Sequence, residues 1–255
     1  MLRFRVIPIL LLKNSGLYKS INFENYKYIG DPINAIRIFN EKEVDELVLL
    51  DINATIHNRE PDTNMLKLIV SECYMPLSFG GGICNTNMIK EILNIGVEKI
   101  IINTAAIENP NFIREAVKLF GSSTIVISID AKRNFLNNYS VYVRGGKEKT
   151  KKNPIEWAKE CENMGVGEII INSIDNDGCM NGYDWKLIKG VSDSVSIPVI
   201  ASGGASSIHD FNKAINECKV SAVSAGSYFV FHGKHRAVLI SYPSRLELDS
   251  LNKFN

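Results

Sequence analysis

The sequence has no apolar run that approaches the roughly 18–20 residues of a membrane span. Residues 1–12 resemble a signal peptide, but the apolar run at 6–12 is short, contains Pro8, stops at Lys13 and has no small-residue cleavage site. Only five cysteines occur, none in a CxxC pair, which argues against a disulfide framework and a structural zinc site. We therefore expect a soluble protein of the reducing cytoplasm with no membrane partner.

The sequence also lacks a large excess of charge of either sign, because 29 basic and 28 acidic side chains leave a net charge of only +1. Such a balance gives no general attraction to nucleic acid, so we expect no nucleic-acid partner and only local anion sites. Metal-ligand clusters are missing as well: His232 and His235 are three residues apart, but no third ligand is evident. We expect no metal.

Short apolar runs recur along the chain, and they do not alternate with polar residues. Strands that are buried on both faces, as in parallel sheets, have this pattern. The runs predict eight strands, at residues 6–12, 47–52, 76–79, 99–102, 124–129, 168–171, 197–201 and 220–225.

Helical segments separate these runs, and their ends are marked. Asp31, Asn109 and Asn153 each precede a proline, which is typical of a capping residue followed by the first helical position. Glycines at 96, 121 and 165 are placed to end helices. Eight strands that alternate with helices over 255 residues predict a single (β/α)8 TIM barrel, with a doubly wound open sheet as the structural alternative.

The chain also repeats itself at an offset of 122 residues. Residues 197–204 resemble residues 75–82, and the stretch that begins at Glu168 resembles the one that begins at Glu46. We expect one domain over residues 1–255, made of half-barrels at about 1–123 and 124–232, with a variable tail at 233–255.

Glycine-rich turns follow several predicted strands, where active sites of such barrels lie. Glycine lets backbone N–H groups approach an anion closely, and neighbouring polar side chains add donors. The sequence thus indicates two phosphate sites for a phosphorylated small molecule, although tight turns alone would also need glycine. The candidate phosphate-binding residues are Gly81, Gly82, Asn103, Thr104, Gly178, Gly203, Gly204, Gly226 and Ser227.

Carboxylates also end predicted strands. Asp130 closes one run, and a carboxyl in an apolar pocket can serve as a general acid. The alternative is an ion pair with Lys132 or Arg133. Asp177, before Gly178, either orients substrate hydroxyls or belongs to a plain turn.

Together these motifs resemble the cyclase (HisF-type) subunit of imidazole glycerol phosphate synthase. The resemblance extends from residue 1 to about 232. Its most specific pieces are residues 45–54, 79–83, 102–106, 129–133, 173–178 and 201–205.

The resemblance implies a barrel that binds a HisH-type glutaminase as a heterodimer and receives ammonia through its centre. Ammonia then enters a ribulosyl aminoimidazole carboxamide nucleotide, which is cyclised and cleaved without metal or organic cofactor. Lys19 matches a family lysine in the mobile loop after the first strand. The residues that match the charged ammonia gate at the barrel floor are Arg5, Glu46, Lys99 and Glu168.

The sequence departs from the family at the end of the first strand. The family has an aspartate there, across from the one matched by Asp130, whereas this chain has Leu11. A leucine cannot take a proton, so cyclisation would lose its base. At the sixth strand Asn172 replaces the family's usual threonine, and residues 14–20 depart from the family's loop pattern.

The C-terminal residues 233–243 resemble a branch of HisF paralogues that work with a glutaminase and a separate amidotransferase to amidate surface-polysaccharide sugars. We expect this chain to have diverged toward that role. Two alternatives stay open: a working cyclase of histidine biosynthesis with Asp51 or Asp177 as base, and a non-catalytic ammonia conduit.

Overall fold

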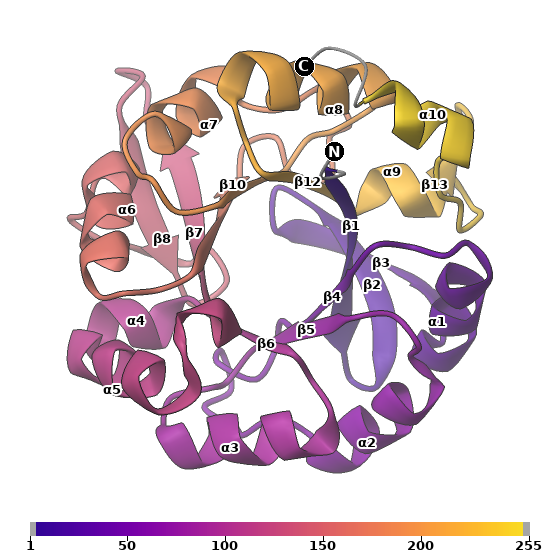
Figure 1. Ribbon diagram of the computed structural model, residues 1–255. Helices are drawn as coiled ribbons and strands as arrows, with labels where there is room; N and C mark the ends of the chain where they lie inside the picture. Colours follow the sequence, from indigo (N-terminus) through magenta and orange to yellow (C-terminus); the bar gives the residue numbers. More distant parts are fainter. Residues whose placement is uncertain (1–3, 252–255) are drawn as a thin grey trace.

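The computed structural model describes residues 4–251, and its main strands close into a barrel (Figure 1). Each neighbouring pair is parallel, and pairings of β10 with β7 and of β12 with β1 complete the ring. The expected TIM barrel is confirmed, and the open-sheet alternative is wrong. The barrel strands are β1 (Arg5–Lys13), β4 (Leu47–Asp51), β5 (Leu77–Gly80), β6 (Lys99–Ile102), β7 (Ile125–Arg133), β10 (Glu168–Ser173), β11 (Val199–Ser202) and β12 (Ala222–Ala225).

Helices surround the barrel and begin where the capping residues predict (Figure 1). The Asp31 carboxylate accepts from the Asn34 backbone N–H at 3.0 Å, and Pro32 occupies the first turn. Within residues 4–251, no helix has the length and apolar character to cross a membrane. The helices are α1 (Pro32–Glu41), α2 (Thr63–Glu72), α3 (Thr86–Ile95), α4 (Thr104–Glu108), α5 (Pro110–Phe120), α6 (Pro154–Asn163), α7 (Trp185–Ser192), α8 (Ile208–Cys218), α9 (Ser227–Val230) and α10 (Arg245–Ser250), with a 3-10 turn at Ser122–Thr124.

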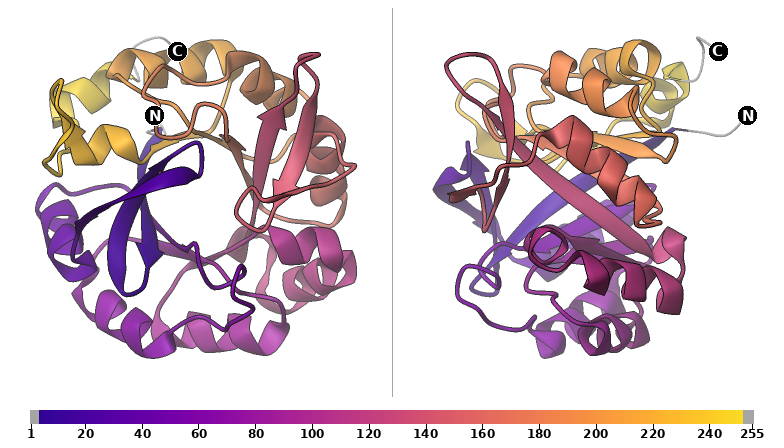
Figure 2. Two further views of the ribbon diagram at one scale, coloured as in Figure 1. Left: turned by 180° about the vertical axis from the view of Figure 1, so that it is seen from behind. Right: turned by 90° about the vertical axis from the view of Figure 1, so that its left-hand side faces the viewer.

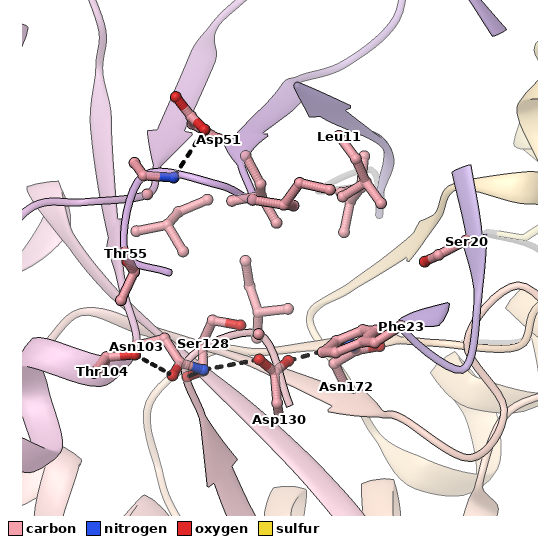
Figure 3. Close-up of a pocket in the computed structure, with 18 of the residues that line it drawn as sticks. Leu11, Ser20, Phe23, Asp51, Thr55, Asn103, Thr104, Ser128, Asp130 and Asn172 are labelled. Carbon is pink, nitrogen blue, oxygen red and sulfur yellow. Dashed lines mark hydrogen bonds between the residues drawn. The ribbon is translucent and has the colours of Figure 1, made fainter. Parts of the chain in front are cut away.

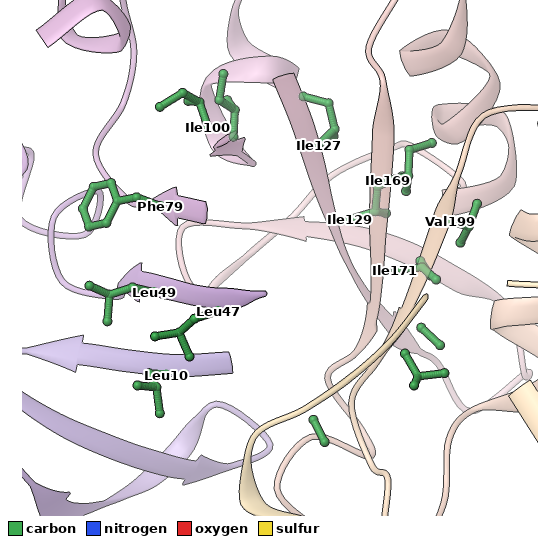
Figure 4. Packing of buried hydrophobic residues seen from close by; sticks show 14 of the residues in the cluster. Leu10, Leu47, Leu49, Phe79, Ile100, Ile127, Ile129, Ile169, Ile171 and Val199 are labelled. Carbon is green, nitrogen blue, oxygen red and sulfur yellow. The ribbon is translucent and has the colours of Figure 1, made fainter. Parts of the chain in front are cut away.

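Alternate residues of each barrel strand enter two separate apolar clusters. Leu47 and Leu49 of β4 pack outward, in the large cluster between the sheet and the helices (Figure 4). Val48, between them, belongs to a smaller cluster inside the barrel. Both faces of the strands are therefore buried, which is why the sequence runs are apolar throughout.

Two antiparallel hairpins extend the carboxyl ends of β1 and β7. The first is β2 (Gly16–Ile21) with β3 (Glu24–Gly30), and the second is β8 (Tyr139–Val143) with β9 (Glu148–Lys149). Residues 14–20, expected to be a loop, are therefore largely strand. Figure 2 shows the β2–β3 hairpin lying over one end of the barrel, and we call it the strap.

The C-terminal tail packs against the barrel rather than extending from it. After α9 it forms a short hairpin of β13 (Phe231–His232) and β14 (Ala237–Val238). The Tyr242 hydroxyl then donates to the Val6 carbonyl at 2.7 Å, near the start of β1. Residues 252–255 of the expected tail, and residues 1–3 of the signal-like opening, lie outside the described residues.

Replacing Phe211 with alanine should destabilise the fold by about 3–5 kcal/mol, the usual cost of emptying a buried aromatic site. Its side chain is fully buried, and its ring lies 5.2 Å from that of Tyr228 and 6.0 Å from that of Phe229. Phe135→Ala is the matched control, because Phe135 is 92% exposed. Urea unfolding monitored by circular dichroism measures both changes, and equal effects of the two variants would contradict the described core.

Candidate functional site

A cavity of about 500 Å³ opens at the carboxyl ends of the barrel strands. This volume is typical of a small-molecule pocket. Every candidate phosphate-binding residue lines it. Four form a first anion cluster at the ends of β5 and β6, namely Gly81, Gly82, Asn103 and Thr104. Five form a second anion cluster after β10, β11 and β12, namely Gly178, Gly203, Gly204, Gly226 and Ser227.

The order of strands around the barrel places the two anion clusters on opposite sides of the mouth. Going round from β1, the strands β5 and β6 come third and fourth, whereas β11 and β12 come seventh and eighth. A ligand that reaches both clusters must span the cavity. The arrangement suits a small molecule with an anionic group at each end.

Asp130 lies between two amide side chains in this cavity (Figure 3). Its carboxylate accepts from Asn103 Nδ2 at 2.9 Å and from Asn172 Nδ2 at 3.2 Å. Burial raises the pKa of Asp130 to about 7, while these two hydrogen bonds oppose the rise. Within residues 4–251 neither Lys132 nor Arg133 forms an ion pair with it, so the ion-pair alternative is wrong. A carboxyl of this kind can donate a proton near neutral pH.

The strap places Lys19 in the lining of the same cavity. Lys19 belongs to β2, in the expected connection after the first barrel strand, where the chain forms a hairpin. It is 4% exposed and donates from Nζ to the Ile9 carbonyl. Burial lowers the pKa of Lys19 to about 8, against the attraction of Asp177. Burial likewise raises the pKa of Asp177 to about 6, opposed by Lys19 and by the Ser20 hydroxyl at 3.3 Å.

Two glycines of the second anion cluster allow the strap to lie this close. A Cβ atom at Gly178 would stand 1.9 Å from the Ser20 carbonyl oxygen, and Gly178 has a φ of +74°. A Cβ atom at Gly226 would stand 2.2 Å from Lys19 Nζ. The backbone of the strap therefore fits against the turn only with glycine at position 178, whereas a side chain at position 226 would displace the Lys19 ammonium group.

Asp51 lines the cavity, but its carboxylate binds groups of its own loop (Figure 3). It accepts from the backbone N–H groups of Asn53 and Ala54, each at 3.1 Å, and pairs with Arg59 at 2.8 Å. These contacts shape the turn after β4. They leave Asp51 poorly placed to accept a proton from a substrate.

Leu11 extends the apolar barrel interior up to the mouth. It lines the cavity and, with Leu50, packs against the interior cluster, which lies between the mouth and the floor of the barrel. Figure 3 places Leu11 and Asp130 on different sides of the cavity. The members of the interior cluster are Ile7, Ile9, Val48, Ile101, Val126, Ile170, Ile200 and Ala222.

Four charged side chains form a closed ring at the opposite, amino-terminal end of the strands. Arg5 pairs with Glu46 at 2.6 Å and with Glu168, while Lys99 lies 3.1 Å from Glu46 and 3.0 Å from Glu168. Burial opposes the charge on Glu46, yet Lys99, the Ser78 hydroxyl and Arg5 together hold the pKa of Glu46 below its ordinary value. We call this set the floor ring. Two charges of each sign make it neutral overall.

Two residues of the mouth had no recognised role in the sequence. Phe23, at the tip of the strap, lines the cavity and lies against Gly146 of the β8–β9 turn, where a Cβ atom would meet its ring at 2.8 Å. Arg144 of that turn donates its backbone N–H to Thr104 Oγ1 at 3.0 Å and binds Glu108 at 2.6 Å. The Gly-Gly pair at 145–146 is a turn signal that could have located this hairpin.

Within residues 4–251, no three His, Cys, Asp or Glu side chains come together in a way that could hold a metal ion. His232 and His235 are both exposed, in the β13–β14 hairpin. All five cysteines are free thiols.

The fold and the site define an enzyme-type (β/α)8 barrel with a partly apolar pocket, which carries ionisable groups, at the carboxyl ends of its strands. The family model for "Histidine biosynthesis protein" matches residues 5–236. A Pseudomonas aeruginosa protein named as imidazole glycerol phosphate synthase subunit hisF2 is 51% identical over 249 residues, which cover 98% of this chain and 99% of that protein.

Two further relatives are also named as HisF subunits of this synthase. A Leptospira interrogans protein named as subunit HisF of the same synthase is 45% identical over 98% of this chain and 99% of its own length. The Lactococcus lactis subsp. cremoris subunit HisF is 43% identical over 90% of this chain and 89% of its own length. The chain therefore belongs to the HisF-type family of cyclase subunits of imidazole glycerol phosphate synthase, and the resemblance of its motifs is confirmed.

The Asp130 carboxyl should titrate with a midpoint near pH 7, as followed by its 13C resonance and assigned with Asp130→Asn. Because the folded-state pKa is raised, protonation stabilises the fold fully below about pH 4, and this stabilisation is lost as the pH rises through 7. The free energy of unfolding of Asp130→Asn relative to the unmodified chain should thus increase between pH 4 and 7. A titration midpoint below pH 5 would contradict the burial of this carboxyl.

Glu46→Gln should lower the free energy of unfolding by about 1–3 kcal/mol, because it removes a buried carboxylate and leaves two partly buried cations with Glu168 as their remaining ring carboxylate. Glu43→Gln is the control, since the Glu43 side chain is 82% exposed and lies 3.9 Å from Arg245. Its effect should stay within about 0.5 kcal/mol. Urea unfolding at pH 7 measures both, and a silent Glu46→Gln would show that the floor ring does not stabilise the barrel.

Proposed function

We propose that this chain is the ammonia-using partner of a HisH-type glutaminase in the cytoplasm, and that it has diverged from ring closure toward ammonia supply for sugar amidation. The observation that carries the proposal is Leu11, which occupies the position of the family's base aspartate. A separate amidotransferase would complete the transfer to a surface-polysaccharide sugar.

The barrel interior favours passage of ammonia from floor to mouth. A neutral ammonia molecule loses little on entering an apolar interior, whereas an ammonium ion would pay a large desolvation cost. The floor ring stands at the entry end of this interior, and its ion pairs must part for a molecule to enter. A matched set of two cations and two anions keeps the ring paired when it closes.

The mouth retains one half of an acid–base pair. Asp130 has the burial and the pKa of a general acid. Leu11 supplies no proton acceptor, and losing one such partner typically costs about 10²–10⁴-fold in rate. Lys19 and Asp177 remain in the cavity and can still bind and orient a substrate.

Residues 233–243 favour the same branch, because this segment resembles the paralogues of sugar amidation. The relative with 51% identity is itself named hisF2 rather than HisF. Both anion clusters line the cavity, which supports a phosphorylated ligand and disfavours a pure conduit.

A working cyclase of histidine biosynthesis is the second candidate, and it needs another base. Asp51 is committed to its own loop and to Arg59. Asp177 is the better candidate, because it lies in the cavity with a pKa of about 6.

Leu11→Asp should create or strongly increase turnover of the ribulosyl aminoimidazole carboxamide nucleotide with saturating ammonium and no glutaminase. We expect negligible turnover by the unmodified chain and a gain of about 10²-fold or more in the variant, because the variant restores a carboxylate across the mouth from Asp130. Product formation is followed by the change in absorbance as the substrate is consumed.

Leu50→Asp is the matched control, since Leu50 also lines the cavity and packs against the interior cluster. It should not gain activity. Substantial turnover by the unmodified chain would overturn the claim that Leu11 disables cyclisation and would assign the protein to histidine biosynthesis.

A further inference from the structure

The C-terminal hairpin brings a cation to the second anion cluster. Arg236 ends the turn between β13 and β14, where its backbone N–H donates to the Gly233 carbonyl at 3.0 Å. Its Nη2 atom donates to the Gly178 carbonyl at 3.0 Å and lies 3.5 Å from Ser227 Oγ. Gly178 and Ser227 are both members of the second anion cluster and line the cavity. Arg236 is not itself one of the lining residues, so its guanidinium lies directly beside two residues of the cavity wall.

Arg236 differs in its ion pairing from the two arginines that line the cavity. Arg59 is neutralised by Asp51 at 2.8 Å, and Arg144 by Glu108 at 2.6 Å. Arg236 forms no ion pair with a carboxylate anywhere in residues 4–251. A guanidinium has five N–H donors in a fixed fork, and the Arg236 bonds to Gly178 and Ser227 use only its Nη2 atom. Its Nε and Nη1 groups keep donors for an anion.

Contacts with the strap and with an aromatic ring hold the hairpin in this place. The Arg236 guanidinium lies over the Phe231 ring at 4.7 Å from the centroid, and Lys27 Nζ lies over the same ring at 5.2 Å. Lys27 of β3 also donates to the Arg236 carbonyl at 3.2 Å. Because the strap covers the mouth, this link fixes Arg236 relative to the cavity.

We propose that Arg236 binds a phosphomonoester group in the second anion cluster, so that the C-terminal hairpin forms part of the binding site. The backbone turns of this cluster provide only neutral donors, and Arg236 adds a full positive charge with bidentate geometry for phosphate. Ser227 Oγ accepts from Nη2, which leaves its hydroxyl hydrogen free to donate to the same phosphate. The proposal rests on the phosphate-binding role proposed for the mouth and identifies which side of it selects for a dianion.

Calorimetric titration with glycerol 3-phosphate tests the proposal on the full chain. Arg236→Gln should weaken binding at pH 7.5 by about 10-fold or more, the effect of losing one hydrogen bond to a charged group. The affinity of Arg236→Lys should lie between those of the unmodified chain and of Arg236→Gln, because lysine keeps the charge but lacks the planar fork of donors. Lys234→Gln removes the same charge from an exposed position of the same turn and should change the affinity by less than about 2-fold.

The pH dependence separates contact with phosphate from a merely structural role. A phosphomonoester gains its second negative charge near pH 6. The affinity of the unmodified chain for glycerol 3-phosphate should therefore rise more between pH 5.5 and pH 7.5 than that of Arg236→Gln. If Arg236 only held Gly178 and Ser227 in place, the variant would weaken binding equally at both pH values, and the proposal would be overturned.

Three other outcomes would also overturn it. They are unchanged binding by Arg236→Gln, an equal loss in Lys234→Gln, and no binding by the unmodified chain. None depends on turnover, so the result is independent of whether Leu11→Asp restores cyclisation.

Discussion

Closure of the sheet by the pairing of β7 with β10 is the constraint on which the rest of the molecule depends. Once each barrel strand has a neighbour on both sides, its side chains can point only toward the helices or into the interior. The interior is then too dry for unpaired charge, so charged groups gather at its two ends. At the floor they neutralise one another in a ring, and at the mouth they titrate near neutral pH.

Burial acts in opposite directions on the acids and the base of the mouth, and so brings their pKa values together. It raises the pKa of Asp130 and Asp177 and lowers that of Lys19, to values of about 7, 6 and 8. Amide donors and mutual attraction limit these shifts without cancelling them. A pocket with this composition can exchange protons at neutral pH. What it performs then depends on which positions face the reacting atoms, and this is where Leu11 matters.

The sequence was sufficient to predict the barrel, because strands buried on both faces and capped helices have strong local patterns. The clusters at the strand ends followed from that topology. The hairpins did not: residues 16–30 form the strap through long-range contacts such as that of the Asn22 backbone N–H with the Asp177 carbonyl at 2.8 Å. Arg236 was missed for the same reason, since its role depends on Gly178, 58 residues away in the chain.

Leu11 also has a stabilising effect that explains why a chain released from cyclisation would keep it. A carboxylate at the upper edge of the interior cluster would lie beside Ile9 and Leu50, at a cost in desolvation that only catalysis would justify. Leucine removes that cost and adds buried apolar area. The floor ring gains nothing comparable from replacement, because its charges already pair with one another. Under the proposed loss of cyclisation, position 11 is therefore a place in the mouth where replacing the carboxylate would also make the fold more stable.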